Sequence, residues 1–319
     1  MNFRRLTARL HSADVLIIGF FGFLTVLNLI FASRIPHWKM LVGINCCVMV
    51  AVWLLASARH STGWKVLVFL HDWYVPPMVF FSFKELYYMI RPIHFGVDYD
   101  GALIAMDRWL FGVDPTVWIS RLTHPIITEV LQIAYTLFFF LFLVVGFELY
   151  RRHNLDLFHF FLFTGAYGFF LSYLGYFLLP AVGPRFTLHD FSALDSELPG
   201  LWLTPHLRWF VNAGESIPMD VPNAVALAGT QRDVFPSGHT MMTIVLMFFG
   251  ARYRLKVRRF LYVTGALLII ATVYQRYHYV VDLIGGGVFA IFCLTTAPSL
   301  YMFVKNNLQT IEGRFPKAG

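Results

Sequence analysis

Two short stretches of the chain hold residue types that could transfer a phosphoryl group. The first is Pro-Ser-Gly-His at 236–239, which directly precedes an apolar run. Backbone N–H groups at the start of a helix form an anion site; Gly238 would let a ligand approach closely, and Ser237 would add a hydroxyl donor. The simpler interpretation is that Ser237 only caps the helix.

The second stretch is His-Tyr-Val-Val-Asp at 278–282, at the start of the last apolar run. Because they are four residues apart, His278 and Asp282 would share one helical face, where a carboxylate can orient an imidazole. An imidazole held in this way can act as a nucleophile. The alternative is a polar pair that stabilises the helix end, but ionisable groups at a membrane boundary are costly and favour a functional role.

Basic residues elsewhere in the chain could hold phosphate oxygens. Lys84 and Arg91 lie seven residues apart, two turns along one side of a helix that Pro92 would end. They could clamp a phosphate, or they could simply extend toward the membrane interface. Arg185 follows a rigid turn in Pro-Ala-Val-Gly-Pro-Arg and supplies another guanidinium.

The composition requires that membrane helices position these residues. Hydrophobic residues make up 58% of the 319 residues and charged residues only 13%, whereas soluble domains carry about 25% charged residues. We therefore predict an all-α, polytopic bundle of about six to eight transmembrane helices. Apolar stretches suitable for helices lie at 14–32, 40–57, 66–89, 126–149, 157–179, 238–251, 259–275 and 279–304.

Two of these stretches are irregular, and the N-terminal stretch, 14–32, has to be distinguished from a signal peptide. The third contains Pro76 and Pro77, so a broken helix is expected there, and the sixth is short. The first exceeds the roughly 7–15 residues of a signal-peptide core, which predicts a retained helix.

The placement of Lys and Arg predicts the orientation of the bundle. With the N-terminus in the cytoplasm, most basic residues fall inside, including Arg4, Arg5 and Arg9 and the basic run 252–260. All four motifs then reach the extracytoplasmic face, where we expect the active site of this integral membrane protein. Most acidic residues lie on the same face, in connections at about 92–125 and 180–236.

Other features argue against competing classes of protein. The net charge of +7 sorts by topology and does not indicate nucleic-acid binding. Residues 98–115 have apolar positions at helical spacing and predict a helix along the membrane surface. Cys46, Cys47 and Cys293 lie in apolar runs, which disfavours a disulfide framework or metal cluster.

Two pairs of polar residues outside the main motifs, Asp98 with Asp100 and His71 with Asp72, have simpler interpretations than a catalytic role. Asp98 and Asp100 could bind a cation, although loop carboxylates are usually only solvated. His71 and Asp72 are interpreted as a polar pair within the membrane rather than as catalytic residues.

Together the motifs resemble the type 2 phosphatidic acid phosphatase superfamily, whose signature reads KxxxxxxRP, PSGH and SRxxxxxHxxxD. The first two are present, as Lys84–Pro92 and Pro236–His239. The third departs, because Arg276 precedes His278 by only two residues, Gln275 replaces the serine and position 272 is Thr. The HYxxD form and the GPR turn at 183–185 resemble the branch of inositol phosphorylceramide synthase and sphingomyelin synthase.

The resemblance, which covers about Lys84 to Gly287, implies a division of labour. His278 would be the nucleophile that forms a phosphohistidine, Asp282 its orienting partner, and His239 the acid that protonates the departing oxygen. The phosphoryl oxygens would be held by further residues: Lys84, Arg91, Ser237, Gly238, and Arg185 or Arg276. Positioned cations and N–H donors can stabilise the spread charge of such a transfer without a metal or other cofactor.

The resulting expectation is a membrane lipid phosphotransferase that moves a phospho-headgroup from a phospholipid to a lipid alcohol. A hydrolase acting on a lipid or polyprenyl phosphate, with water as acceptor, stays open, and a transporter is a remote alternative. We expect N-terminal transmembrane helices over 1–60, the catalytic membrane domain over 61–305 and a cytoplasmic tail over 306–319. The sequence leaves the oligomeric state and the source membrane open.

Overall fold

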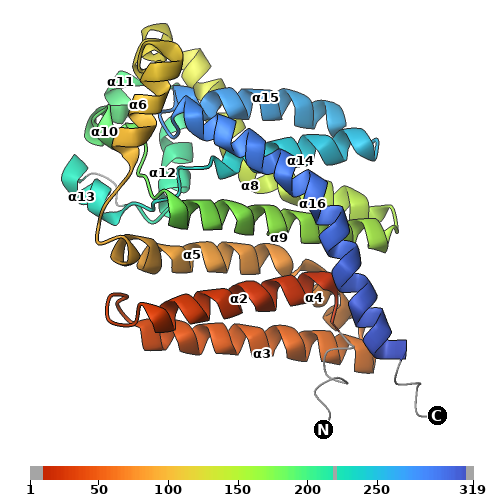
Figure 1. Cartoon of the computed structure of the whole chain (residues 1–319). Helices are drawn as coiled ribbons and strands as arrows, with labels where there is room; N and C mark the ends of the chain where they lie inside the picture. Colours follow the sequence, from red (N-terminus) through yellow and green to blue (C-terminus); the bar gives the residue numbers. More distant parts are fainter. Residues whose placement is uncertain (1–9, 218–220, 314–319) are drawn as a thin grey trace. The chain divides into compact units, whose positions relative to one another are not determined.

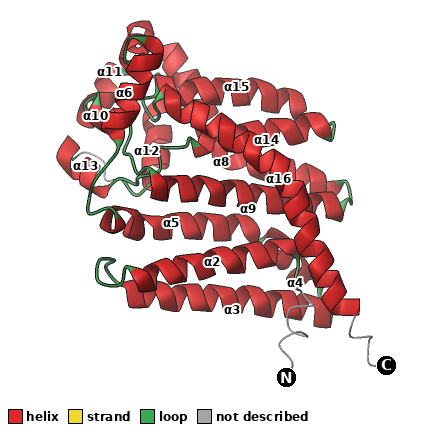
Figure 2. Ribbon diagram, in the orientation of Figure 1, coloured by secondary structure: helices red, strands yellow, loops and turns green. Residues whose placement is uncertain are grey.

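The computed structural model describes residues 10–217 and 221–313, and every regular element among them is a helix (Figure 2). The prediction of an all-α membrane bundle is therefore confirmed. The predicted cytoplasmic residues Arg4, Arg5 and Arg9 lie outside the described residues, as does the predicted tail beyond residue 313.

Five helices are long and apolar enough to cross a membrane, and a bent pair would make a sixth. The bent pair is α4 (Lys65–Trp73) with α5 (Val75–Ile93), which meet at 43° where the third apolar stretch was expected to break. The five single helices are α2 (Ser12–Ile30), α3 (Trp38–Thr62), α8 (Pro125–Arg151), α9 (Leu155–Leu178) and α16 (Val280–Gly313).

Helices also form at the sixth and seventh predicted stretches, but both are short. They are α14 (Gly238–Arg252) and α15 (Arg258–Tyr274), of 15 and 17 residues. Because a straight span needs about 20 residues, neither has the length of the other spans. The chain is an integral membrane protein with helices at all eight predicted stretches.

The described chain divides into two compact units. The first unit contains residues 10–93, 153–170 and 292–313, and the second contains 94–152 and 171–291, apart from the undescribed 218–220. Both α9 and α16 contribute residues to each unit.

In the first unit, α2 and α3 run side by side, and α5 packs against α2 (Figure 1). Buried polar groups join these helices. The Glu85 carboxyl group of α5 accepts hydrogen bonds from Asn28 of α2 and Asn45 of α3, each at 2.9 Å. Side chains of this kind hold helices together where no water competes for the hydrogen bonds.

In the second unit, α8, α14 and α15 pack together, and the two long polar connections fold into short helices around them. One carboxylate anchors much of the second connection. Glu129 of α8 accepts hydrogen bonds from the N–H groups of Leu201, Leu203 and Thr204, so it caps the start of α12 (Thr204–Gly214). The other short helices are α6 (Asp100–Phe111), α7 (Pro115–Ile119), α10 (Pro184–Thr187), α11 (Leu194–Glu197) and α13 (Asn223–Gly229).

Candidate active site

The predicted nucleophile and its carboxylate lie together at the start of α16. The Nδ1 atom of His278 is 3.4 Å from Oδ2 of Asp282, and both side chains are buried, with exposed fractions of 5% and 0%. This distance is longer than a normal hydrogen bond, and Nδ1 has no hydrogen-bond partner. The His278 ring donates a hydrogen bond to the Val234 carbonyl, so the nitrogen that donates it is Nε2.

The Pro-Ser-Gly-His turn is tied directly to this helix. The backbone N–H of Ser237 donates to the Asp282 carbonyl at 2.9 Å. The Ser237 hydroxyl oxygen accepts from the N–H of Thr240 at 3.2 Å, so Ser237 is the N-cap of α14, as the simpler interpretation had it. The two motifs, 41 residues apart from Ser237 to His278, thus form one local structure.

Glycines allow this turn to pack closely against its neighbours. A Cβ atom at Gly286 of α16 would lie 2.6 Å from the Ser237 carbonyl oxygen, and one at Gly175 of α9 would lie 2.2 Å from Pro236 Cδ. A Cβ at Gly238 itself would lie 2.5 Å from the Tyr176 hydroxyl. Because real Cβ atoms do not approach so closely, these three positions must lack a side chain if the turn is to keep its place.

An aromatic stack holds His239 near His278. The His239 ring stacks on Tyr135 of α8 with centroids 4.6 Å apart, and Tyr135 stacks on Tyr277 at 4.1 Å. The centroids of the His239 and His278 rings are 5.7 Å apart, with the ring planes at 63°. The fold therefore brings both predicted catalytic histidines to one place, and Asp282 lies beside one of them.

Arg185 is the predicted phosphate ligand that faces both histidines. Its guanidinium group is buried, pairs with Glu215 and hydrogen-bonds to Asn212 of α12 at 3.4 Å. Its charge acts on His278: burial, then His239 and Arg185, lower the pKa of His278 well below its ordinary value. The free imidazole of His278 is therefore neutral, which is the form that can attack phosphorus. Nε of Arg185 is buried without a hydrogen-bond partner.

Arg276 has a different place, although the sequence made it an alternative to Arg185. Its backbone has φ of 64° and ends α15 in a Schellman motif, in which N–H groups of Arg276 and Tyr277 donate to the Val273 and Thr272 carbonyls. Its guanidinium pairs with Glu197, and together with burial it lowers the pKa of His189 to about 4. The side chain thus lies with Glu197 and His189, not with the histidine pair.

Two carboxylates that the motifs did not indicate hold the site in position. Asp100 of α6 accepts from the N–H of Gly183 at 2.8 Å and from the Tyr279 hydroxyl at 2.8 Å. Asp107 accepts from the N–H groups of Val280 and Val281 at 2.9 and 2.8 Å, which caps the start of α16. An acidic residue at every seventh position of an otherwise apolar segment was the available signal.

The remaining predicted phosphate ligands belong to the first unit. Lys84 and Arg91 lie on α5, two helical turns apart as expected, and the helix ends at Ile93 just after Pro92. The Lys84 ammonium lies 5.4 Å from the Phe80 ring centroid. The other predicted site residues all lie in the second unit.

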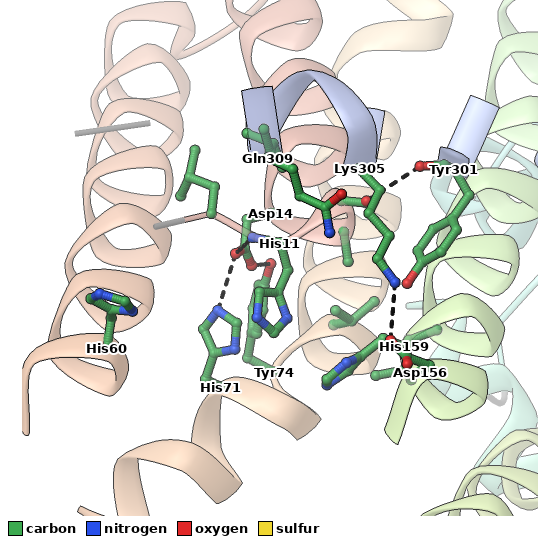
Figure 3. Close-up of a pocket in the computed structure, with 16 residues that line it drawn as sticks. His11, Asp14, His60, His71, Tyr74, Asp156, His159, Tyr301, Lys305 and Gln309 are labelled. Carbon is green, nitrogen blue, oxygen red and sulfur yellow. Dashed lines mark hydrogen bonds and ion pairs between the residues drawn. The ribbon is translucent and has the colours of Figure 1, made fainter. Parts of the chain in front are cut away.

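The first unit has a second set of histidines, which we call the histidine–carboxylate cluster: His11, Asp14, Arg59, His71, Asp72 and His159. Four of its residues, His11, Asp14, His71 and His159, line a cavity of about 250 Å³ (Figure 3). His71 and Asp72 do not pair with each other. Nε2 of His71 is 3.1 Å from Asp14, and Nε2 of His159 is 3.0 Å from Asp72. The predicted polar pair of His71 with Asp72 is therefore not formed, because each of the two residues has a different partner.

The Asp98 and Asp100 carboxylates are both engaged by protein groups. Asp98 forms two hydrogen bonds with Arg232, at 3.1 and 3.2 Å, and Asp100 accepts the hydrogen bonds described above. Within residues 10–217 and 221–313, no group of three or more His, Cys, Asp and Glu side chains is arranged to hold a metal ion.

Comparison with known proteins gives one match. Residues 101–296 match a family model described as the PAP2 superfamily. This range begins after the Lys84–Pro92 motif and includes the motifs at 236–239 and 278–282. No curated protein and no solved structure matches the chain.

Proposed function

The chain belongs to the PAP2 superfamily, and from that premise we propose that it is a membrane lipid phosphotransferase working through a phosphohistidine on His278. Membership supports lipid phosphoryl chemistry in general. The observation that carries the specific proposal is the placement of the buried His278 beside Asp282, with its ring centroid 5.7 Å from that of His239. Burial, His239 and Arg185 lower the pKa of His278 and so favour its neutral form.

In the first step, a ring nitrogen of His278 attacks phosphorus of the donor phospholipid. A nitrogen–phosphorus bond forms, and the bond between phosphorus and the departing lipid oxygen breaks. Burial and the charge of Arg185 lower the pKa of His239 to about 3 in the free site, so His239 takes up its proton when the negatively charged phosphate binds beside it. Protonated His239 then gives that proton to the departing oxygen, so the lipid leaves as an alcohol. Arg185 stabilises the charge on the phosphoryl oxygens, because a preorganised cation in a buried site need not reorganise during the reaction.

The attacking atom is Nε2, and its proton must first move or be displaced. In the free site Nε2 donates to the Val234 carbonyl while Nδ1 faces Asp282. When Nδ1 carries the proton and donates it to Asp282, Nε2 presents its lone pair to phosphorus and loses the bond to Val234. Shortening of the 3.4 Å contact would accompany this change, as catalytic hydrogen bonds often tighten when substrate binds.

In the second step, His239 removes the proton of an acceptor hydroxyl, and the acceptor oxygen attacks phosphorus. The nitrogen–phosphorus bond breaks, which restores His278 and leaves His239 protonated for the next cycle. Atoms and charges balance with no further reactant. A lipid alcohol as acceptor gives transfer, and water gives hydrolysis, so the same residues serve both activities.

Transfer is favoured over hydrolysis by the His-Tyr-Val-Val-Asp form of the last motif and by the Gly-Pro-Arg turn. The burial of His278 and Asp282 also favours it, since a phosphohistidine that is shielded from water survives until a lipid acceptor arrives. We place this chemistry on the extracytoplasmic face. The loops rich in basic residues are expected in the cytoplasm, and the four motifs are expected on the other side of the membrane.

The test is a turnover assay on purified protein in vesicles that contain phospholipid with a labelled phosphate. With a lipid alcohol present, we expect label in a new lipid product and in acid-labile phosphohistidine. His278→Ala should lose both labels, and Asp195→Asn, which removes an exposed partner of Arg208, serves as the control. Water-soluble label as the sole product, with acceptor present, would leave hydrolysis as the activity. A fully active His278→Ala protein would contradict the catalytic assignment itself.

A further inference from the structure

The short helix α6 has two faces of opposite character. Its buried face carries Asp100, Leu103 and Asp107 at helical spacing. Its exposed face is apolar, and the side chain of Trp109 is 83% exposed. The other large exposed apolar residues on it are Met106, Leu110 and Phe111.

The exposed face carries little net charge, because the cation on it, 56% exposed, is paired with a carboxylate. Arg108 is its one basic residue among the described residues of α6, and it forms two hydrogen bonds to Asp114, at 2.8 and 2.9 Å. The apolar surface continues past α6 into Val117, Trp118 and Leu122, each more than 40% exposed. A contiguous apolar surface of this kind marks an interaction site. Tryptophan is the residue that membrane interfaces favour most.

The buried face is bonded to both segments that form the candidate active site. Asp100 accepts from the N–H groups of Val182 and Gly183, which precede Arg185, and from the Tyr279 hydroxyl. Asp107 accepts from the first N–H groups of α16, directly after His278. A shift of α6 therefore moves the acceptors that fix Arg185 and His278.

We propose that the exposed face of α6 binds the lipid–water interface and that this contact sets the position of the catalytic histidine. The inference rests on the proposed role of His278. In it, Asp107 is a positioning residue: it touches no substrate, but it holds the first turn of α16. Lipid contact on one face of α6 and carboxylate hydrogen bonds on the other would make turnover depend on the bilayer as well as on the substrate headgroup.

The position of α6 in the chain indicates that lipid, rather than another protein, contacts its exposed face. It follows the bent pair α4–α5, a broken span or a re-entrant segment, and precedes α8, a candidate membrane span, so the segments on both sides of it are apolar enough to enter the membrane. The exposed face also has the composition of an interfacial helix, with Trp and Phe among aliphatic residues and a self-neutralised charge.

The first test measures lipid contact without using activity. Protein is placed in phosphatidylcholine vesicles whose acyl chains carry bromine, which quenches nearby tryptophan. Subtracting the emission of Trp109→Phe from that of the wild type isolates Trp109, and Trp202→Phe isolates a tryptophan of equal exposure, 82%. We expect stronger quenching of Trp109 than of Trp202. Emission from Trp109 that bromine leaves unchanged would overturn the proposal, and protection of Trp109 by a copurifying protein would do the same.

The second test separates lipid contact from positioning. Trp109→Ser should lower turnover of phospholipid in vesicles about tenfold, the effect of losing one buried large side chain. Its turnover of a short-chain, water-soluble substrate should stay the same. Asp107→Asn should lower kcat about a hundredfold for both substrates, because small displacements of reacting groups cost that much. The control for this variant is Asp195→Asn, which makes the same carboxylate-to-amide change at an exposed partner of Arg208 and should leave kcat unchanged for both substrates.

The outcomes distinguish the two proposals. If Asp107→Asn fails to fold, the quenching result and the Trp109→Ser result still decide the lipid contact. Equal loss in Trp109→Ser for both substrates, or equal effects in Trp109→Ser and Trp202→Ser, would overturn the coupling. Loss of the phosphohistidine assignment would instead appear as labelled enzyme in His278→Ala, while bromine quenching of Trp109 would be unaffected.

Discussion

The two units each gather histidines around carboxylates, but they leave the imidazoles in different states. In the first unit, His71 and His159 each hold a carboxylate at normal hydrogen-bond distance, 3.1 and 3.0 Å. In the second, His278 faces Asp282 at 3.4 Å, and neither Nδ1 of the histidine nor Oδ1 of the aspartate has a hydrogen-bond partner.

The hydrogen-bond partners of the two clusters offer a criterion for separating a structural histidine from a candidate catalytic one. Asp14 accepts hydrogen bonds from the His11 backbone, from His71 and from Tyr74, so both oxygens of this buried carboxylate have partners. Buried groups without a partner are uncommon and costly, and they persist where a ligand or a reaction supplies the missing partner. Oδ2 of Asp72 in the first unit is also buried without a partner, so the contrast lies in the imidazoles. Nδ1 of His278 has no partner, whereas His71 and His159 each reach a carboxylate at 3.1 and 3.0 Å, and this difference supports the catalytic role proposed for His278.

Replacing one histidine of each unit by glutamine should give the largest difference in turnover. His278→Gln removes the nucleophile, so we expect turnover to fall by roughly 10⁴-fold or more. His71→Gln keeps an amide donor for Asp14, so turnover should stay within about threefold of the wild-type rate. The free energy of unfolding should fall by about 1 kcal/mol. Turnover and thermal unfolding of both variants in the same detergent check this pair. Comparable activity loss in the two would erase the distinction between the units.

The arginine of each cluster gives a smaller contrast. Arg185→Gln removes the cation that faces both histidines, and loss of one preorganised group of this kind lowers kcat by about 10²–10³-fold. Arg185→Lys keeps the charge but not the planar fork that Glu215 and Asn212 bind, so it should recover only part of the rate. Arg59→Gln alters only the histidine–carboxylate cluster, where Arg59 lies 3.4 Å from Asp72, and we expect nearly normal turnover.

Single-turnover rates of labelling would check these variants. If Arg59→Gln slowed labelling as much as Arg185→Gln, the first unit would have a part in the reaction. Because Arg185→Gln also leaves Glu215 buried without its partner, folding is verified by gel filtration before rates are compared.

Glycines provide a third contrast, in stability. A Cβ at Gly286 would lie 2.6 Å from the Ser237 carbonyl oxygen, whereas one at the next residue, Gly287, meets nothing within 4 Å. In the first unit, Gly43 of α3 has equally open space. We expect Gly286→Ala to lower the free energy of unfolding by about 1–3 kcal/mol and to slow phosphohistidine formation, since it pushes on the Pro-Ser-Gly-His turn.

Gly287→Ala and Gly43→Ala are the matched controls for this change. Both add the same methyl group to a helix, where Ala is favoured over Gly, so neither should destabilise the protein. Thermal unfolding measured for the three variants compares them, and an unfolding temperature for Gly286→Ala equal to that of Gly287→Ala would contradict the packing argument.

Much of the fold followed from the sequence because lipid imposes a simple rule. Eight apolar stretches predicted eight helical regions, and the break near Pro76 was found as a bend between α4 and α5. Short motifs with a fixed spacing, such as His278 with Asp282, were equally predictable. The roles of Arg185 and Arg276 were not, because each depends on a partner far away in the chain: Glu215 for one and Glu197 for the other.

The roles of the supporting carboxylates Asp100 and Asp107 could not be assigned from the sequence, for a related reason. Asp107 looked like one acidic residue in a surface helix, and its function lies in the N–H groups of residues 280 and 281, which only tertiary structure brings to it. Tyr135 gave even less signal, since an aromatic residue in an apolar helix is the ordinary case. Its stacking between His239 and Tyr277 appears only once α8 and α14 are packed.

Titration should show the smallest difference. Burial lowers the pKa of His11 to about 3 and, with His239 and Arg185, lowers that of His278 well below its ordinary value, so both units hold neutral imidazoles at pH 7. A histidine with an ordinary pKa of about 6.5 would be mostly protonated at pH 6, and attack would slow about fourfold relative to pH 7.5. Because its pKa is lowered, His278 should stay neutral over this range, so its protonation should cause no fall in the rate of phosphohistidine formation toward pH 6. The pKa of the acid His239 is also lowered, to about 3, so its protonation can only raise this rate as the pH falls. A fourfold fall toward pH 6 that follows one proton would show that burial does not keep His278 neutral in the free site.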